Sequence, residues 1–316
     1  MNVLCWNCRG LGNLRTVHEL TKLVRCYNPL VLFLSETKRK STEMEKLRVT
    51  LGFDNCMVVD SIGKSGGLAL LWLSEVCLEV VSFSNQHIDS KIGDSASEEV
   101  WRFTGFYGNP VVGDRWKSWN ILRRLSESQS LPWLCAGDFN EILYDNEKMG
   151  GALRATKQME DFRTVLYECN LQEVPYSGPK FTWSRGKGPD MILERLDRGL
   201  ASEDWLHRFQ GACEKHLVAI QSDHCPLLFY VAKSLPNKGR KGGHFRFENM
   251  WVRHKDCEEV VKKGWRKGRV NNFDDLVSEL GNCGKVLSKW NREVVGNIQH
   301  CIRRKEVELK HLLSVV

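Results

Sequence analysis

Long apolar runs are absent from this sequence of 316 residues. No stretch reaches the roughly 18 consecutive apolar residues that a transmembrane helix needs. The N-terminus also lacks a basic segment followed by an apolar core, which a secretion signal would show. We therefore expect an intracellular protein that neither spans a membrane nor is secreted. Internal repeats and low-complexity tracts are absent as well, which excludes a solenoid.

Paired cysteine spacings, which a zinc module requires, are also lacking among the 12 cysteines. Only Cys5 and Cys8 in "CWNC" stand close together, and this segment looks extended. A redox pair normally lies at a strand-to-helix turn, so we interpret these cysteines as free thiols in a reducing compartment. The chain is long enough to bury a core without disulfides.

Positive charge is not in excess over most of the chain. Residues 1–232 hold 27 Lys and Arg against 29 Asp and Glu, a net charge of −2, whereas residues 233–316 hold 19 against 10, a net charge of +9. The segment "KSLPNKGRKGGHF" at 233–245 has the composition of a linker. We therefore predict one domain over 1–232, followed by a basic linker and helical tail over 233–316.

Strand-like and helix-like segments alternate in the first part. Amphipathic periodicity predicts helices at 16–28, 115–128 and 156–170, and more weakly patterned helices at 255–265 and 276–313. Apolar and β-branched runs predict strands at 2–8, 30–37, 66–73, 78–84, 101–108, 131–139, 180–186 and 224–232. This order indicates an α/β domain, and the hairpin-like neighbours 78–84 and 101–108 argue against a purely parallel sheet.

Polar side chains follow several of the predicted strands. "LPWLCAGDFNEIL" ends a buried run with Asp138 and Asn140, which point the same way on an extended chain. Asn7, Glu36 and Tyr107 end three other strands. Each has a simpler explanation alone, as a turn residue, a helix-entry carboxylate, a core aromatic residue or a cap.

Three more polar residues belong to the same set. Asp197 lies between apolar positions and could instead form an ion pair with Arg195 or Arg198, while His224, next to Asp223, could be a core histidine. Taken jointly, crowded carboxylates need a cation, and a hard divalent ion with oxygen ligands such as Mg²⁺ fits them. A histidine with an aspartate supplies a general base or acid. This combination suits attack of water on a phosphodiester.

The ordered motifs "WNCRGLG", "SETK", "GFYGNP", "AGDFNEI", "FTWSRG", "RLDRGL" and "SDHCPL" resemble the endonuclease/exonuclease/phosphatase superfamily. Within it they are most similar to the apurinic-type endonuclease domain of plant LINE-type retrotransposons that lack long terminal repeats. The resemblance covers about residues 1–232. It implies a DNase I-like, four-layered α/β sandwich of two mixed sheets flanked by helices, to which the predicted helical tail is appended. In the tail, "FRFENMW" and "WNREVVGNIQ" resemble the segment before reverse transcriptase.

The resemblance also implies a metal site. Glu36 would be the main ligand of Mg²⁺, or of Mn²⁺ as the alternative ion, with Asn7 and Asp223 at or near the metal. No motif departs from the family's pattern, so we predict an intact site.

Catalytic roles follow in the same way. Asp138 would orient or deprotonate the attacking water, and Asn140 would hold the scissile phosphate. Asp197 would orient His224, which would contact a phosphate oxygen, while Tyr107 would reach the same phosphate or the leaving group. How the work is divided among Asp138, Tyr107 and His224 stays open at this point.

Three hypotheses for function follow. The first is an Mg²⁺-dependent endonuclease that nicks DNA and leaves 3′-hydroxyl and 5′-phosphate ends, which implies a nuclear location. The second is an abasic-site repair nuclease, and the third is an inactive retroelement remnant that binds nucleic acid through its basic tail. The helix 115–128 offers Trp116, Trp119, Arg123 and Arg124 to DNA, although tryptophans at this spacing are more often core.

A polymerase is not expected in this chain. "NFDDLVSEL" at 272–280 contains two adjacent aspartates but has the composition of a helix start. The sequence therefore predicts DNA as a partner and no reverse transcriptase domain, and it leaves protein partners open.

Overall fold

The computed structural model describes residues 1–232 except 64, 95–98, 129 and 219, and then residues 251–252, 254–265 and 273–291. The chain divides into two compact units, Met1–Leu235 and Pro236–Val316. No helix in the described ranges combines the length and the apolar character needed to cross a membrane.

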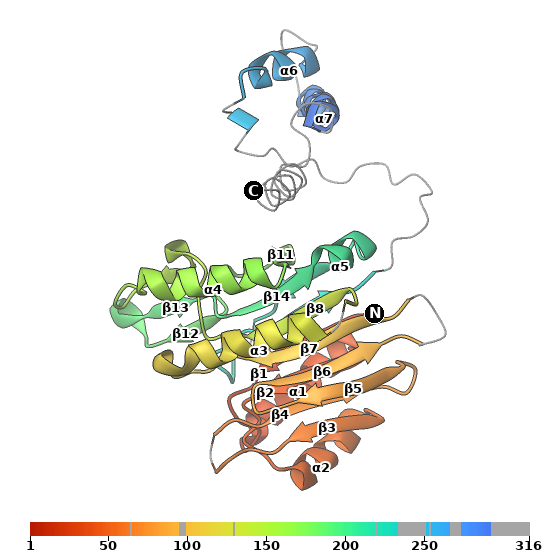
Figure 1. Cartoon of the computed structure of the whole chain (residues 1–316), viewed down its shortest axis with the longest axis vertical. Coiled ribbons are helices and arrows are strands. Elements are labelled where there is room, and N and C mark those ends of the chain that lie inside the picture. Colours follow the sequence, from red (N-terminus) through yellow and green to blue (C-terminus); the bar gives the residue numbers. More distant parts are fainter. Residues whose placement is uncertain are drawn as a thin grey trace, which may run out of the picture. The chain divides into compact units, whose positions relative to one another are not determined.

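In its described residues, the first unit alternates strands with five α-helices (Figure 1). The helices are α1 (Leu14–Tyr27), α2 (Ser41–Leu51), α3 (Arg115–Ser128), α4 (Thr156–Glu168) and α5 (Glu203–Arg208). The strands are β1 (Asn2–Asn7), β2 (Val31–Ser35), β3 (Asn55–Val59), β4 (Leu68–Trp72), β5 (Leu78–Phe83), β6 (His87–Ile92), β7 (Trp101–Tyr107), β8 (Trp133–Asp138), β9 (Lys148–Met149), β10 (Leu171–Glu173), β11 (Tyr176–Ser177), β12 (Trp183–Arg185), β13 (Ile192–Glu194), β14 (Asp197–Ser202), β15 (Cys213–His216) and β16 (Leu227–Tyr230).

Two large mixed sheets are formed by the described strands. One has the order β11-β15-β16-β1-β2-β4-β3, and the other has the order β10-β14-β8-β7-β6-β5. The pairs β1–β2 and β7–β8 are parallel, whereas β1–β16, β2–β4 and β14–β8 are antiparallel. A small third sheet contains β12, β13 and β9. The predicted pair of mixed sheets with flanking helices is confirmed.

The layers follow from the alternation of side chains along each strand. In β1, Val3 and Cys5 belong to the core cluster that also holds residues of the second sheet. Leu4 and Trp6 point the other way, into a cluster with the buried residues of α1 and α2. The second sheet is covered in the same manner by α3 and α4. The result is four layers, helix, sheet, sheet and helix (Figure 1).

The two sheets approach closely at Gly105 of β7. A Cβ atom at this position would lie 2.2 Å from Cδ2 of Phe33, a fully buried ring on β2. Glycine therefore makes room for the ring between the sheets.

The predicted hairpin between 78–84 and 101–108 is wrong, because β6 lies between β5 and β7. The sequence of β6, "HIDSKI", looks too polar for a buried strand. Its Asp89 is nevertheless fully paired, since Arg102 donates to it from Nε at 2.8 Å and Thr104 donates from Oγ1 at 2.6 Å. Buried polar groups are tolerated when they are hydrogen-bonded in this way.

The second unit contains α6 (Cys257–Gly264) and α7 (Phe273–Trp290), which pack through a small cluster around Trp251, Leu287 and Trp290. The adjacent aspartates of "NFDDL" lie at the start of α7, in agreement with the predicted helix. The predicted linker 233–245 and the remainder of the predicted helix up to 313 lie outside the described residues.

Candidate active site

The strands of the inner core bring polar side chains to one end of the sandwich. Along β1, the inward positions Val3 and Cys5 are followed by Asn7, and along β8 the inward Leu134 and Ala136 are followed by Asp138. The same alternation therefore carries the site residues into the space between the sheets.

Strand register aligns three of these residues across the second sheet. Tyr107, the last residue of β7, pairs with Asp138, the last residue of β8, in the parallel ladder. Asp197, the first residue of β14, pairs with the same Asp138 in the antiparallel ladder. Because directly opposite residues on a sheet face the same side, all three side chains meet at this edge.

Asn7 is at the centre of the group. Its buried Nδ2 donates to Oδ2 of Asp138 at 2.9 Å and to Oε1 of Glu36 at 3.1 Å, and it lies 3.4 Å from Nε2 of His224. One amide from the first sheet thus links two carboxylates and an imidazole that come from separate parts of the chain.

Glu36 follows β2 in a left-handed backbone conformation, with φ of 51°. It does not enter a helix. Its Oε1 also accepts a hydrogen bond from the Tyr107 hydroxyl at 3.1 Å, and its Oε2 lies 3.4 Å from Nζ of Lys38. Burial opposes ionisation of Glu36, but the hydrogen bond from Asn7 and the charge of Lys38 outweigh it and lower its pKa. The carboxylate is therefore ionised, and burial together with Glu36 raises the pKa of Tyr107, which stays a hydrogen-bond donor.

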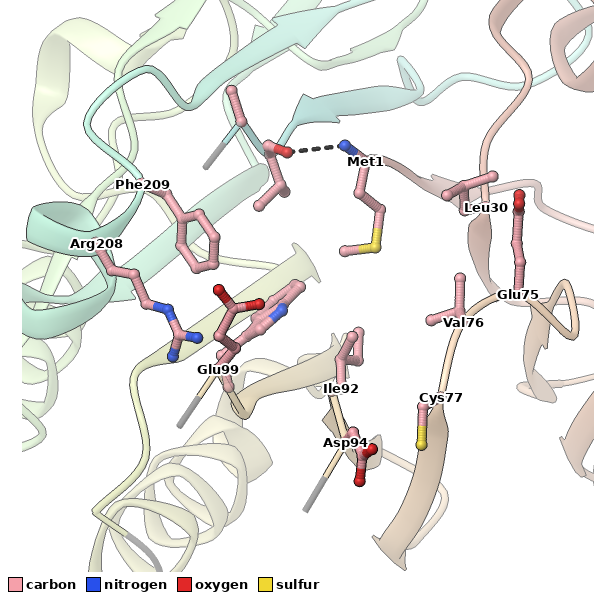
Figure 2. A pocket seen from close by; sticks show the side chains of 14 residues that line it. Met1, Leu30, Glu75, Val76, Cys77, Ile92, Asp94, Glu99, Arg208 and Phe209 are labelled. Carbon is pink, nitrogen blue, oxygen red and sulfur yellow. Dashed lines mark hydrogen bonds between the residues drawn. The ribbon is translucent and has the colours of Figure 1, made fainter. Parts of the chain in front are cut away.

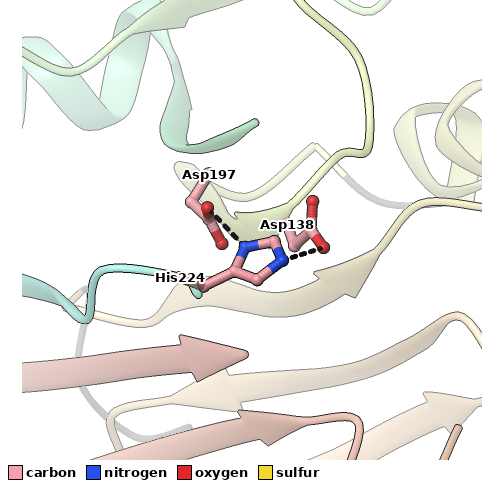
Figure 3. Close-up of side chains that lie close together, drawn as sticks. All are labelled: Asp138, Asp197 and His224. Atoms are coloured by element: carbon pink, nitrogen blue, oxygen red, sulfur yellow. Dashed lines mark hydrogen bonds and ion pairs between the residues drawn. The ribbon is translucent and has the colours of Figure 1, made fainter. Parts of the chain in front are cut away.

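His224 lies between two carboxylates (Figure 3). Its Nδ1 is 2.8 Å from Oδ2 of Asp197, and its Nε2 is 3.8 Å from Oδ2 of Asp138. All three side chains are buried. Trp6 donates from Nε1 to the carbonyl of His224 at 3.0 Å, which fixes the backbone of the loop before β16. His224 is therefore held from both ends rather than packed as an ordinary core histidine.

Electrostatics favour a charged ring in this arrangement. Burial alone would lower the pKa of His224, but the charges of Asp197 and Asp138 outweigh burial and raise it. Burial raises the pKa of Asp138, and the charge of His224 acts against that rise. One imidazolium ring therefore lies between two buried carboxylates and compensates part of their charge. Arg195 and Arg198 bind Glu147 instead, so the alternative ion pair with Asp197 is wrong.

Asn140 combines a turn with a site position. Its backbone N–H donates to Oδ1 of Asp138 at 2.8 Å, as in an Asx turn, and its φ is 55°. The Nδ2 atom donates to the carbonyl of Gly108 at 2.9 Å and lies 3.2 Å from Oδ2 of Asp138. The turn is therefore present, and Asn140 also lines the cavity beside the site, while its contact with a phosphate stays a prediction.

The side chain of Asp223, the residue before His224, is bonded to residues outside the predicted set. Its carboxylate binds the guanidinium of Arg9 and accepts a hydrogen bond from Nε1 of Trp183 at 2.9 Å. It lines the same cavity as Glu36, Asn140 and His224, but no hydrogen bond between its side chain and theirs is among the described contacts.

This cavity has a volume of about 560 Å³ and opens the site to solvent. Much of its lining is basic, which no sequence pattern indicates because the basic residues are far apart along the chain. The basic residues of the lining are Arg9, Lys38, Arg115, Lys148, Arg154 and Arg185.

A second cavity, of about 540 Å³, lies at the opposite ends of the strands (Figure 2). Met1, which precedes β1, and Val231, which follows β16, line it, whereas the site lies beyond the other end of β1. Figure 2 shows Met1 and Phe209 directed toward this space, with acidic residues and Arg208 around it. Its described lining residues include no histidine, and its apolar character is unlike that of the site.

One group of metal-ligand side chains stands out among the described residues. Ligand atoms of Asp138, Asp197 and His224 lie within 4.8 Å of one another, so this group can hold an ion. A protonated His224 has no lone pair to offer, however, and its Nδ1 already faces Asp197. Glu36 can also offer a ligand atom, because its lowered pKa keeps it ionised and it lines the cavity that opens the site to solvent.

Comparison with known proteins places this geometry in context. Residues 4–224 match the Endonuclease/Exonuclease/phosphatase family. Comparison with the sequences of curated proteins gives no match.

Three solved structures illustrate the similarity in fold. The endonuclease domain of TRAS1, a telomere-specific non-LTR retrotransposon, has a TM-score of 0.53 and 15% identity, with 73% of this chain and 97% of that chain covered. The 3′-5′ exonuclease NExo from Neisseria meningitidis has a TM-score of 0.58 and 16% identity, with 73% and 99% covered. The AP endonuclease LMAP from Leishmania major has a TM-score of 0.56 and 17% identity, with 72% and 86% covered.

Proposed function

Because the chain belongs to the endonuclease/exonuclease/phosphatase family, a family of nucleases and phosphatases, we propose that it is a divalent-metal-dependent endonuclease that nicks DNA. The observation that carries the proposal is the continuous set of contacts from Glu36 through Asn7 and Asp138 to His224 and Asp197. This set offers one ionised carboxylate for a cation, a second carboxylate for water and a cationic ring for a phosphate.

The oxygen donors around Glu36 fit a hard cation such as Mg²⁺ or Mn²⁺. Glu36 would be the main ligand, with Asn7 and Asp223 near it. The ionised state of Glu36 supports this assignment, because a hard cation binds a carboxylate and not a carboxylic acid. When bound, the metal ion polarises a phosphoryl oxygen and offsets the charge that develops there.

The remaining residues have separate tasks in this mechanism. Asp138, fixed by the amides of Asn7 and Asn140, orients the water and accepts its proton. Asn140 contacts the scissile phosphate. His224, oriented by Asp197, contacts a nonbridging phosphate oxygen with its charged ring, and the Tyr107 hydroxyl donates to the same phosphate or to the leaving oxygen.

DNA is the substrate that the surroundings of the site favour. The cavity lining contains six basic side chains, and residues 233–316 carry a net charge of +9. Such groups bind phosphates without reading sequence. The retrotransposon endonuclease domain among the similar structures supports the same choice. A DNA substrate implies a nuclear location, which we propose on that basis alone.

Nicking of supercoiled plasmid tests the proposal. Wild-type protein should convert plasmid to open circles in Mg²⁺ and not in chelator. Glu36→Ala and His224→Ala should each reduce the rate by about 10²–10³. Glu79→Ala and His207→Ala, two exposed positions outside the cavity, serve as matched controls and should nick normally. Undiminished nicking by the Glu36 and His224 variants, with unchanged circular dichroism, would refute the assignment.

An abasic-site nuclease is the second candidate, because an AP endonuclease is among the similar structures. The two activities separate in one experiment. A duplex with a single abasic site and the same duplex with an intact nucleotide are digested side by side. A rate ratio near one supports the nicking endonuclease, whereas cleavage confined to the abasic duplex supports repair.

A further inference from the structure

One side of the 560 Å³ cavity is lined by Arg115, Lys148, Arg154 and Glu194, which are held in buried ion pairs. Arg115 binds Glu141, and Arg154 bridges Glu141 and Glu194 from Nε at 3.0 Å and Nη2 at 2.7 Å. Lys148 binds the other oxygen of Glu194. We call these five residues the basic wall. Their side chains are between 0% and 14% exposed.

The basic wall carries more positive than negative charge. Three cations face two carboxylates, which leaves a net charge of +1. Among the described residues, no acceptor bonds with the buried Nε of Arg115. Burial lowers the pKa of Arg115, and the positive charge of the neighbouring Arg154 lowers it further. The negative charge of Glu141 raises this pKa but does not outweigh them. A guanidinium keeps its proton in proteins, so this shift indicates a cation that is under-compensated and would be stabilised by an added anion.

The basic wall is also joined to the proposed catalytic residues. Glu141 directly follows Asn140, and Arg115 starts α3 a few residues after Tyr107. Arg115, Arg154 and Lys148 line the same cavity as Glu36 and His224. A network that only held the loop in place would need neither the surplus cation nor access to this cavity.

We propose that Arg115, Arg154 and Lys148 bind a second, non-reacting phosphate of the nucleic acid strand, next to the phosphodiester that is hydrolysed. The proposal rests on the proposed function of the site. The cavity has the volume of a site for a drug-sized ligand, which exceeds what a single phosphate requires. Arginine forks and a lysine ammonium are suited to phosphate oxygens. This subsite would fix the register of the strand and favour polynucleotides over small phosphodiesters.

Two substrates separate this role from catalysis. Bis(4-nitrophenyl) phosphate contains the scissile group but no neighbouring phosphate, whereas a duplex oligonucleotide contains both. Arg115→Lys keeps the charge beside Glu141 and loses the planar fork, and Lys148→Met removes a charge while Arg154 still pairs with Glu194. Lys157→Met, an 83% exposed position on α4, is the matched control for lost charge.

We expect Arg115→Lys and Lys148→Met to reduce kcat/KM for the oligonucleotide by about tenfold or more, mainly through KM, because a charged hydrogen bond is lost. Hydrolysis of bis(4-nitrophenyl) phosphate should stay within about twofold of wild type. An equal loss on both substrates, or no loss on the oligonucleotide, would overturn the proposal.

A binding measurement in chelator decides the same point without catalysis. For Lys148→Met, the slope of log affinity against log salt for the duplex should become shallower by about 0.9, the value for one phosphate contact. Lys157→Met should leave the slope unchanged. An unchanged slope for Lys148→Met would overturn the subsite, even if wild-type protein hydrolysed neither substrate and the proposed function failed.

Discussion

Asn7→Asp changes one atom group at the centre of the site without changing its shape. The amide Nδ2, which donates to Glu36 at 3.1 Å and to Asp138 at 2.9 Å, becomes a carboxylate oxygen. Two hydrogen bonds are lost, and a third carboxylate then faces two others. We expect a large loss of stability in metal-free protein and a partial recovery when a divalent cation is added.

The size of this loss follows from the distances. At an effective dielectric constant of about 20, two unit charges roughly 3 Å apart repel by about 5 kcal/mol. The new carboxyl group can avoid this by staying protonated, and holding a carboxyl group with an ordinary pKa of about 3.9 neutral at pH 7.5 costs about 5 kcal/mol. A protonated carboxyl group regains one hydrogen bond, and the charged ring of His224, 3.4 Å from this position, offsets part of the repulsion. We therefore expect the free energy of unfolding to fall by about 2–4 kcal/mol.

Urea unfolding in chelator and in excess Mg²⁺ measures both effects. The cation should stabilise Asn7→Asp more than wild type, since an added carboxylate increases its affinity for the folded state. Asn2→Asp, at the other end of β1, is the control: its amide donates only to a carbonyl, of Tyr27 at 2.9 Å, so a loss of about 1–2 kcal/mol without a special Mg²⁺ response is expected. Equal stability of Asn7→Asp and wild type in chelator would refute the central role of this amide.

Three further predictions concern the scaffold of the site. Gly105→Ala places a Cβ 2.2 Å from the Phe33 ring and should cost about 1–3 kcal/mol by urea unfolding, with part of the loss recovered in the double variant with Phe33→Leu. Burial opposes ionisation of Glu147, but the charge of Arg198 outweighs burial and lowers the pKa of Glu147. The ionised Glu147 therefore stabilises the fold at pH values above its ordinary pKa of 4.5, and this stabilisation is lost as the pH falls below that value. Glu147→Gln should therefore be less stable than wild type at pH 7, and the difference should shrink toward pH 3.5 in acid titrations followed by fluorescence. Trp119→Ala removes a 5% exposed ring that stacks on another aromatic side chain, so it should cost about 3–5 kcal/mol in the same urea assay.

Local patterns predicted the elements that combine strong periodicity with clear ends. The predicted helix 115–128 matches α3 residue for residue, and 16–28 and 156–170 differ from α1 and α4 by two residues at most at each end. In α3, Trp119 is buried and Trp116 is 56% exposed, so only one of the two tryptophans belongs to the core. The apolar residues of α2 have helical spacing too, but the segment contains few of them and was not predicted.

The polar side chains at the ends of strands were predictable, because side chains alternate regularly and every second residue points inward up to the end of the strand. The long-range pairs were not. Nothing near Arg115 in the sequence indicates a buried partner, and its partner Glu141, which follows the turn at Asn140, is fully buried. The basic wall therefore depends on tertiary contacts between segments 26 and 40 residues apart, which local periodicity does not encode.

The alignment of Tyr107, Asp138 and Asp197 across three neighbouring strands makes the site sensitive to changes in chain length. Deleting one residue within β8 would turn Asp138 toward α3 and α4. A side chain that now faces these helices would then point into the core between the sheets. Insertions in the loops beyond these strands do not change which side chains of each strand point inward. Divergence of this enzyme is therefore expected to change the lengths of the loops. The number of residues between the core positions and the site residue of each strand should stay the same.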